Sequence, residues 1–328
     1  MPNLRFNDSV PQPWVAGADL IFQVAESDLI RGLIIFARGT VTGTALGAPV
    51  ACNHFPRGLI RLLTFRTDAD NIKTCDALPV SFVGDYFGHR CYLRGGATPA
   101  AGASIPVEAA YHLRMNPDEM QAAATQRRYS YLAQNRRNVN VVVRCGNNTD
   151  LGTDLTFAGF VSVIRDADVI APSQAAKVIQ NLAYRYEDTL TIPIAIGNNR
   201  IALSREGFLR NLTLVATEPV PTHGGTIVDL VEAPINNIAI NVPRGSRPLS
   251  LPYDDACALF RSNASAFSQY DRDNQIGVAI MPFDEDGMGA GVELIDLYTN
   301  QTTLEVNANA ACILMVHQEI LKKPQTRA

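Results

Sequence analysis

The sequence predicts an all-β protein built from two β-sandwiches in tandem. The 328 residues are 47% hydrophobic and 18% charged, a globular composition with room for two domains of ordinary size. Short apolar runs recur along the whole chain, separated by Gly, Pro, Asn and Asp, as in sandwiches and barrels. Similar landmarks also follow one another in the same order in both halves, which indicates a duplicated fold.

Seven strands are expected in the first half and eight in the second. The run NVNVVVR shows the basis, because Val139, Val141 and Val143 fall on one face of a half-buried strand. The expected strands cover residues 20–24, 29–36, 59–67, 80–87, 107–112, 139–144, 156–164, 189–196, 208–217, 226–231, 235–242, 276–281, 292–298, 302–306 and 312–320.

Three helices are expected among these strands. Residues 116–129 begin with a capping Asn116, then Pro117 and two acids, which suit the first turn of a helix. A second helix begins at LPYDDACALF, from residue 251, where Pro is again followed by acids. A third, over residues 173–184, is expected to link the halves.

The strongest sign of duplication is a pair of similar segments half a chain apart. Aligned on Gly58 and Gly207, FPRGLIRLLTF and SREGFLRNLTL share apolar positions and a matched arginine, Arg61 and Arg210. We expect these segments to be equivalent strands, and the two arginines to have equivalent structural roles.

Further landmarks follow in the same order. The helices that begin near Pro117 and Pro252 are each followed by a β run, opened by Asn138 and Asn274 at the same spacing. Closing strands over 156–164 and 312–320 complete the series. Loop insertions explain the changing offset between the landmarks.

Charge and cysteine usage exclude some functional classes. The net charge of −4 does not support nucleic-acid binding as the main task. Residues 1–165 hold 16 Lys and Arg against 13 Asp and Glu, and residues 166–328 hold 12 against 19, so the halves carry about +3 and −7. The six scattered cysteines are interpreted as small buried apolar residues of a soluble chain without a secretory signal.

No motif identifies an enzyme, and the sharpest candidate is a metal loop. Asp284, Asp286, Gly287 and Glu293 fall at positions 3, 5, 6 and 12 of a calcium loop. Position 1 would be Pro282, which has no side-chain oxygen, so an acidic hairpin turn is the favoured interpretation. No other cofactor is indicated, and no residue is assigned a catalytic role.

Two further possibilities come from composition. A carboxylate pair for glycoside hydrolysis stays open, although a single Trp and 7% aromatic residues disfavour a sugar-binding cleft. The tail after residue 321 carries Lys322, Lys323 and Arg327. It is interpreted as a solvated end, with anionic lipid head groups as the sharper hypothesis.

The chain resembles the major capsid proteins of the double jelly-roll lineage, found in tailless icosahedral bacteriophages that enclose a membrane. The resemblance is carried by the FPRGLIRLLTF and SREGFLRNLTL strands, the helices beginning at Pro117 and Pro252, and the closing strand with its tail. It implies two eight-stranded jelly rolls side by side, with short helices in late-strand connections. The expected division is residues 1–165, a linker with a short helix over 166–187, residues 188–321, and a basic tail over 322–328.

The resemblance also implies a function and partners. Three copies would form a pseudo-hexagonal capsomer that tiles an icosahedral shell around an internal membrane, with the basic tail facing that membrane. Implied partners are neighbouring capsomers, minor capsid, penton and membrane proteins, and lipid, with no sequence-specific nucleic-acid binding. The protein would be made in the host cytoplasm and reside in the virion, without enzymatic activity. The alternatives are a glycan-processing hydrolase or amidase on tandem jelly rolls, and a carbohydrate-binding attachment (spike) protein.

Overall fold

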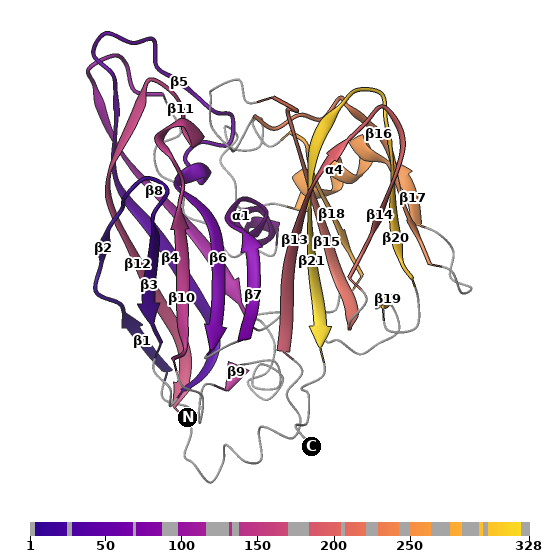
Figure 1. The fold of residues 1–328 in the computed structure, drawn as a ribbon, viewed down its shortest axis with the longest axis horizontal. Coiled ribbons are helices and arrows are strands. Elements are labelled where there is room, and N and C mark those ends of the chain that lie inside the picture. The colour runs from indigo at the N-terminus through magenta and orange to yellow at the C-terminus, as the bar shows by residue number, and fades with distance from the viewer. Residues whose placement is uncertain are drawn as a thin grey trace.

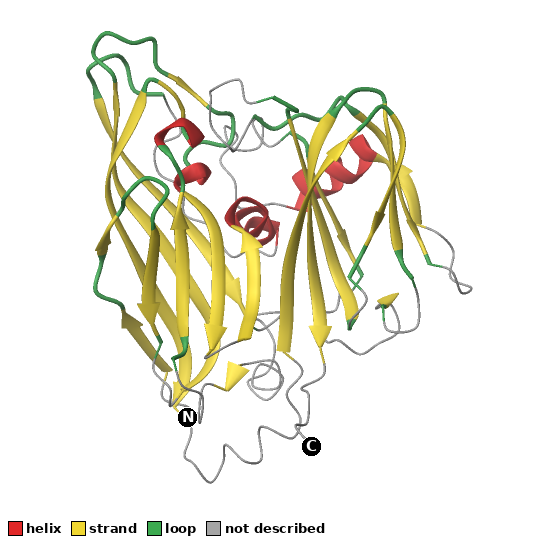
Figure 2. Ribbon diagram, in the orientation of Figure 1, coloured by secondary structure: helices red, strands yellow, loops and turns green. Residues whose placement is uncertain are grey.

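Two jelly rolls stand side by side in the computed structural model (Figure 1). The structure describes residues 4–24, 28–67, 70–86, 98–115, 131–132, 138–169, 184–204, 207–220, 229–242, 249–263, 276–283, 295–297 and 301–322. Strands dominate these residues, with the helices confined to the connections between them (Figure 2). The predicted all-β class is therefore confirmed.

The first jelly roll contains two antiparallel sheets. One has the order β1 (Leu4–Asp8), β12 (Leu155–Val169), β4 (Asp28–Gly43), β8 (Ser104–Arg114), and the other has the order β3 (Asp19–Gln23), β10 (Asn140–Cys145), β6 (Ile60–Thr67), β7 (Asp70–Asp76). Four short strands extend this roll, namely β2 (Gln12–Pro13), β5 (Val50–Ala51), β9 (Tyr131–Leu132) and β11 (Gly152–Thr153). Numbered along the chain, the eight main strands form sheets of order 1-8-3-6 and 2-7-4-5.

The second jelly roll repeats this order strand for strand. Its 1-8-3-6 sheet consists of β13 (Tyr184–Ile194), β21 (Cys312–Lys322), β15 (Phe208–Thr217) and β18 (Val278–Pro282), and its 2-7-4-5 sheet consists of β14 (Gly197–Ala202), β20 (Thr303–Ala308), β16 (Ile235–Asn241) and β17 (Leu249–Pro252). A short strand, β19 (Ile295–Asp296), pairs with β15. Two copies of one eight-stranded topology in one chain are the duplication that the sequence predicted.

Each roll has one helix at the same topological place, between its fifth and sixth strands. These are α1 (Ala77–Tyr86) and α4 (Tyr253–Asn263). Two short 3-10 helices, η1 (Arg57–Leu59) and η2 (Asn148–Asp150), lie in the first roll. The helix expected from residue 251 is confirmed as α4, whereas the helices expected over 116–129 and 173–183 lie outside the described residues; Tyr184 belongs to β13.

The strand predicted over residues 80–87 is wrong, because residues 80–86 form most of α1. Its described side chains, residues 77–84, are all buried. A helix that is buried on every side carries no polar stripe, so its sequence lacks the 3.6-residue period. The prediction missed the outermost main strands β1, β7, β14 and β17 of the four-stranded sheets of the rolls, and the short strands β2, β5, β9 and β11.

The alignment of Gly58 with Gly207 is also wrong in detail. The first segment leads into β6, the fourth strand of its roll, and the second leads into β15, the third strand of its roll. Gly58 is required because a Cβ would lie 2.2 Å from the Asp150 carbonyl oxygen, whereas Gly207 adopts a φ of 98°. Arg61 is exposed and Arg210 is buried, so their roles are not equivalent.

Of the other paired landmarks, two pairings are wrong and one is confirmed. The counterpart of α4 is α1 and not the segment from Pro117. The strand after Asn138 is β10, the seventh of its roll, while the strand after Asn274 is β18, the sixth. The closing strands β12 and β21 are equivalent, as predicted, since each is the eighth strand and pairs with the first and third.

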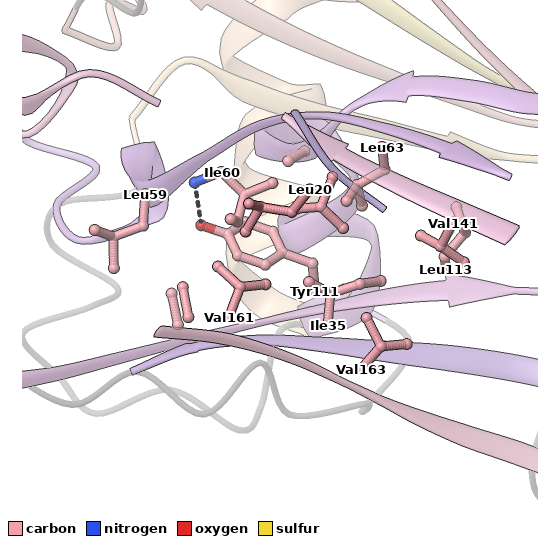
Figure 3. Packing of buried hydrophobic residues seen from close by; sticks show 14 of the residues in the cluster. Leu20, Ile35, Leu59, Ile60, Leu63, Tyr111, Leu113, Val141, Val161 and Val163 are labelled. Atoms are coloured by element: carbon pink, nitrogen blue, oxygen red, sulfur yellow. Dashed lines mark hydrogen bonds between the residues drawn. The ribbon is translucent and has the colours of Figure 1, made fainter. Parts of the chain in front are cut away.

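Each roll encloses its own apolar core. In the first, Tyr111 lies between the sheets, and its hydroxyl accepts from the Ile60 amide at 3.3 Å (Figure 3). The same hydroxyl donates to the Arg57 carbonyl at 2.7 Å. Trp14 is likewise buried, and its indole nitrogen donates to the Leu59 carbonyl at 2.8 Å. These bonds satisfy aromatic polar atoms inside the core, so the large apolar areas can be buried without an unpaired donor.

Candidate assembly surfaces

The two rolls meet along a seam between β7 and β13. The strands run parallel there, with Thr74 opposite Asp188. The Asp76 amide donates to Thr189 Oγ1 at 3.2 Å, and the Thr191 hydroxyl donates to Asp76 Oδ2 at 3.1 Å. Burial is the main cause that raises the pKa of Asp76. At this seam, hydrogen bonds to side chains therefore take the place of most of the main-chain hydrogen bonds that a regular pair of strands would form.

Above the seam, α1 packs between the rolls and contributes apolar side chains to a cluster that both rolls share (Figure 1). Phe82 on α1 meets Phe260 on α4 edge to face, with ring centroids 6.1 Å apart. The Arg57 guanidinium lies over the Phe82 ring, 4.4 Å from the ring centre, and donates to Ser81 Oγ at 2.9 Å. The cluster buries side chains of both rolls: Leu78, Phe82, Val215, Leu230, Phe260, Val278, Ile280 and Met315.

A polar clasp joins the rolls at a third place. The Asn53 amide nitrogen of the main chain donates to Asp229 Oδ1 at 2.8 Å. The Asn53 side chain donates to the Leu230 carbonyl at 2.9 Å and accepts from the Leu230 amide at 2.9 Å. A single side chain of the first roll thus satisfies both main-chain groups of one residue of the second.

His54, the next residue, is buried beside this clasp. It is 3% exposed, and neither ring nitrogen has a hydrogen-bond partner in the described part of the chain. Burial lowers the pKa of His54 to about 4, assisted by Arg57 and opposed by Asp229 and Asp150. The imidazole is therefore neutral near pH 7.

The first roll exposes a partly apolar outer face on its 1-8-3-6 sheet. Phe160 on β12 is 41% exposed and lies opposite Arg38 on β4, whose guanidinium stacks 4.2 Å from the Phe36 ring centre. Arg38 also pairs with Glu108 on β8 at 2.9 Å. Ile34 and Ile164 continue this face as a half-buried cross-strand pair.

The second roll presents a contrasting outer face on its 2-7-4-5 sheet. A shallow groove of about 380 Å³ crosses β14, β20 and β16 and is lined mainly by amide and charged side chains. Asn307 links the strands, since its amide donates to Asn198 Oδ1 at 2.6 Å and its oxygen accepts from Asn236 at 3.2 Å. These mutual bonds satisfy the amides and are consistent with a hydrated surface.

The sequence-predicted sites have mixed outcomes. The calcium candidates Asp284, Asp286 and Glu293 lie outside the described residues, as do Lys323 and Arg327, and these hypotheses stay predictions. Lys322 is the last residue of β21. Within the described ranges, no group of three or more His, Cys, Asp and Glu side chains could hold a metal ion. Likewise, no helix in those ranges has the length and apolarity needed to cross a membrane.

The described cysteines match the prediction that they are buried apolar residues. Cys52, Cys75, Cys145, Cys257 and Cys312 are buried and form no disulfide bond with one another. Burial raises the pKa of Cys52 to about 12 and of Cys145 and Cys312 to about 11, so these thiols stay protonated near neutral pH. The pKa of each of these three thiols is therefore shifted away from that of a cysteine nucleophile.

The residues that join the rolls were not predicted. Asn53 and His54 are single polar residues in a loop, and no local pattern distinguishes them from solvated neighbours. Phe82 had a signal, because the run ALPVSFV is apolar on every face of a helix, which indicates burial on all sides.

Comparison with known proteins supports the architecture. No protein-family model matches the chain, and no curated protein sequence matches it. Among solved structures it is similar to the STIV MCP, at 12% identity and a TM-score of 0.73 over 99% of both chains. A chain from the atomic structure of Sulfolobus turreted icosahedral virus gives 11% identity and 0.73, over 99% of this chain and 92% of that one.

A bacteriophage protein is also among these structures. The major capsid protein P2 of bacteriophage PM2 is 9% identical, with a TM-score of 0.59 over 98% of this chain and 99% of that one. The chain therefore has the double jelly-roll fold of viral major capsid proteins. Because the similar structures come from a bacteriophage and from other viruses, the predicted phage type stays a prediction.

Proposed function

We propose that this chain is a viral major capsid protein whose copies assemble into the shell of a virion. One observation carries the proposal: the similarity to the STIV MCP spans 99% of both chains. A jelly roll alone is a widespread sandwich. In this chain, both rolls and their placement relative to each other correspond to those of the STIV MCP. A structural, non-enzymatic role in the virion, after synthesis in the host cytoplasm, is part of this proposal.

We further propose that three copies form one capsomer with a pseudo-hexagonal outline. Two rolls of one topology in each chain give six similar blocks in a trimer, which supports this stoichiometry. A permanent trimer requires contacts of roughly 2,000 Å² or more in total. Such capsomers would then bind one another, with penton and other minor proteins completing the shell.

Light scattering on the purified full chain, with electron microscopy of the same sample, tests the proposal. The expected result is a trimer that appears as hexagonal blocks and forms sheets or shells. A chain that stays monomeric at all concentrations, with or without membrane vesicles, would contradict it. Cleavage of a glycan or amide by such a monomer would support the hydrolase alternative instead.

The basic tail is proposed to contact an internal membrane. In support, β21 ends at the same end of the rolls at which β1 lies (Figure 1). Replacing Lys322, Lys323 and Arg327 with Gln should weaken binding to vesicles containing anionic lipid by about 1 kcal/mol per residue. Vesicle co-sedimentation measures this, and the control replaces Arg61, Arg144 and Arg200, which are exposed on strands, with Gln. Equal losses in the two triple variants would contradict a specific role of the tail.

A further inference from the structure

The two equivalent helices differ in how much of their surface is covered. Every described side chain of α1, residues 77–84, is buried, because the first roll covers one side and the second roll covers the other. In α4, Tyr253 is buried in the core of its own roll and Phe260 in the cluster between the rolls, while the opposite side of the helix is exposed. That exposed side includes Leu259, whose exposed fraction is 53%.

The contact that covers α1 has a defined geometry. It joins the helix between the fifth and sixth strands of one roll to the outer face of the 1-8-3-6 sheet of the other. On that sheet, α1 packs against Val215 of the third strand and Met315 of the eighth. One chain contains this contact once, although each roll has both of the surfaces that form it.

Within the described ranges, one copy of each surface is therefore left without a partner from the same chain. The first is the outer side of α4, with Leu259 at its centre and Asp254 and Asp255 exposed beside it. The second is the outer face of the first roll's third and eighth strands, β4 and β12, which carries Phe160 and Arg38.

The chemistry of these two surfaces is complementary. Each surface exposes an apolar side chain, Leu259 on α4 and Phe160 on β12, with the half-buried Phe36 ring beside Arg38 on β4. The α4 side carries two acids, and the β4 side carries Arg38, whose side chain is 40% exposed despite its bond to Glu108. Residues 1–165 carry about +3 (16 basic, 13 acidic) and residues 166–328 about −7 (12 basic, 19 acidic), so each contact between unlike rolls joins opposite net charges.

We propose that the outer side of α4 docks on the β4–β12 face of a second copy of this chain, which repeats the internal contact between chains. This inference rests on the proposed capsid function. The contact is heterologous, with two different surfaces, so it must either close a ring or continue as a fibre. A ring of three chains closes when each contact turns one roll by about 60° relative to the next, because the ring then contains six similar rolls.

Co-expression of two single-cysteine variants tests the docking directly. Leu259→Cys is placed on one copy and Phe160→Cys on another, with distinct tags, and a short bis-maleimide is added. The expected product is a covalent dimer that contains both tags, and a Leu259→Cys/Phe160→Cys double variant should also give covalent trimers. Wild type controls for the native thiols, of which the five described are buried. Dimers of Leu259→Cys alone, or the absence of mixed dimers, would overturn the proposed contact.

A second measurement keeps the inference separate from the proposed function. Leu259→Glu places a third carboxylate on the exposed side of α4, and its trimer should dissociate at a concentration at least about tenfold higher than wild type. Leu46→Glu is the matched control, because Leu46 is fully exposed on the loop after β4, and it should leave the trimer unchanged.

The outcomes distinguish the two ideas. A Leu259→Glu trimer as stable as wild type overturns this contact and leaves the capsid function standing. Equal weakening by Leu46→Glu also overturns it, because the effect would not be specific to α4. A wild-type chain that never associates defeats both.

Discussion

At the scale of single residues, the junction between the rolls depends on two neighbouring polar side chains, those of Asn53 and His54. Asn53 satisfies both the amide and the carbonyl of Leu230, and His54 beside it is buried without a hydrogen-bond partner in the described residues. A buried imidazole without such a partner is tolerated only while it is neutral. The junction should therefore respond to acid and to loss of the amide.

The pH prediction concerns His54. Its folded pKa of about 4 lies below the ordinary value of 6.5, so the unfolded chain binds the proton first. The free energy of unfolding should fall as pH drops through this window, by about 3 kcal/mol at most. Urea unfolding of wild type and His54→Leu at several pH values between about 7 and 4 measures it.

The comparison of wild type with His54→Leu isolates the proton that binds His54, because the nearby carboxylates titrate in both proteins. His54→Leu should lose less stability than wild type across the window. Parallel pH profiles for the two proteins would show that His54 is not the group responsible.

Asn53→Ala should destabilise the chain by about 1–3 kcal/mol, because the Leu230 amide and carbonyl lose their partner in a largely buried place. Chemical unfolding gives the difference. Asn237→Ala is the matched control: Asn237 is exposed, its amide bonds Ser250, and its loss should cost about 0.5 kcal/mol or less. Similar losses in both variants would argue against the clasp.

At the scale of elements, α1 is the piece that couples the two cores. It contacts β6, β7 and β8 of its own roll and packs on β15 and β21 of the other. Its burial on all sides accounts for the wrong strand prediction at 80–87, and α4, which keeps an exposed side, was predicted correctly. The difference between the helices is thus one of neighbours, although both occupy the same topological place.

Phe82→Ala should cost about 3–5 kcal/mol, because it removes a fully buried ring that touches Phe260 and Arg57. The rolls should also lose part of their coupling, so calorimetry is expected to show a broadened or split transition. Leu46→Ala, at a fully exposed site, should leave the transition unchanged. A single transition at the wild-type temperature in Phe82→Ala would contradict the role of α1.

At the scale of the whole molecule, the two rolls have opposite net charges, about +3 over residues 1–165 and −7 over residues 166–328, from 16 against 13 and 12 against 19 charged residues. In a head-to-tail ring, rolls of opposite sign alternate at every contact. Long-range attraction would then steer association in addition to the local fit.

Association of the chains should therefore weaken with salt. Raising NaCl from about 0.1 M to about 1 M shortens the Debye length from about 10 Å to about 3 Å, which screens attraction between neighbouring rolls. Light scattering over a dilution series at each salt concentration gives the dissociation point. An unchanged or stronger association at high salt would indicate that apolar contacts alone hold the copies together.

The sequence by itself determined the all-β class, the helix α4 and the closing strands, and it indicated the duplication through paired landmarks of which only the closing strands are equivalent. These features depend on local patterns: alternation along a strand such as β10, a Pro-acid helix start, and turn residues between runs. Burial of one face of each element leaves such patterns in the sequence whatever the neighbours are.

Only the tertiary structure decided which strands are equivalent and where the rolls join. Gly58 and Gly207 look alike in sequence, yet one avoids a carbonyl of η2 and the other supplies a positive φ before β15. Asn53 and Phe82 contact partners more than a hundred residues away in the chain, since Asn53 is bonded across 176 and 177 residues and Phe82 meets Phe260. Contacts between distant segments leave no local period, because they depend on how two complete rolls pack.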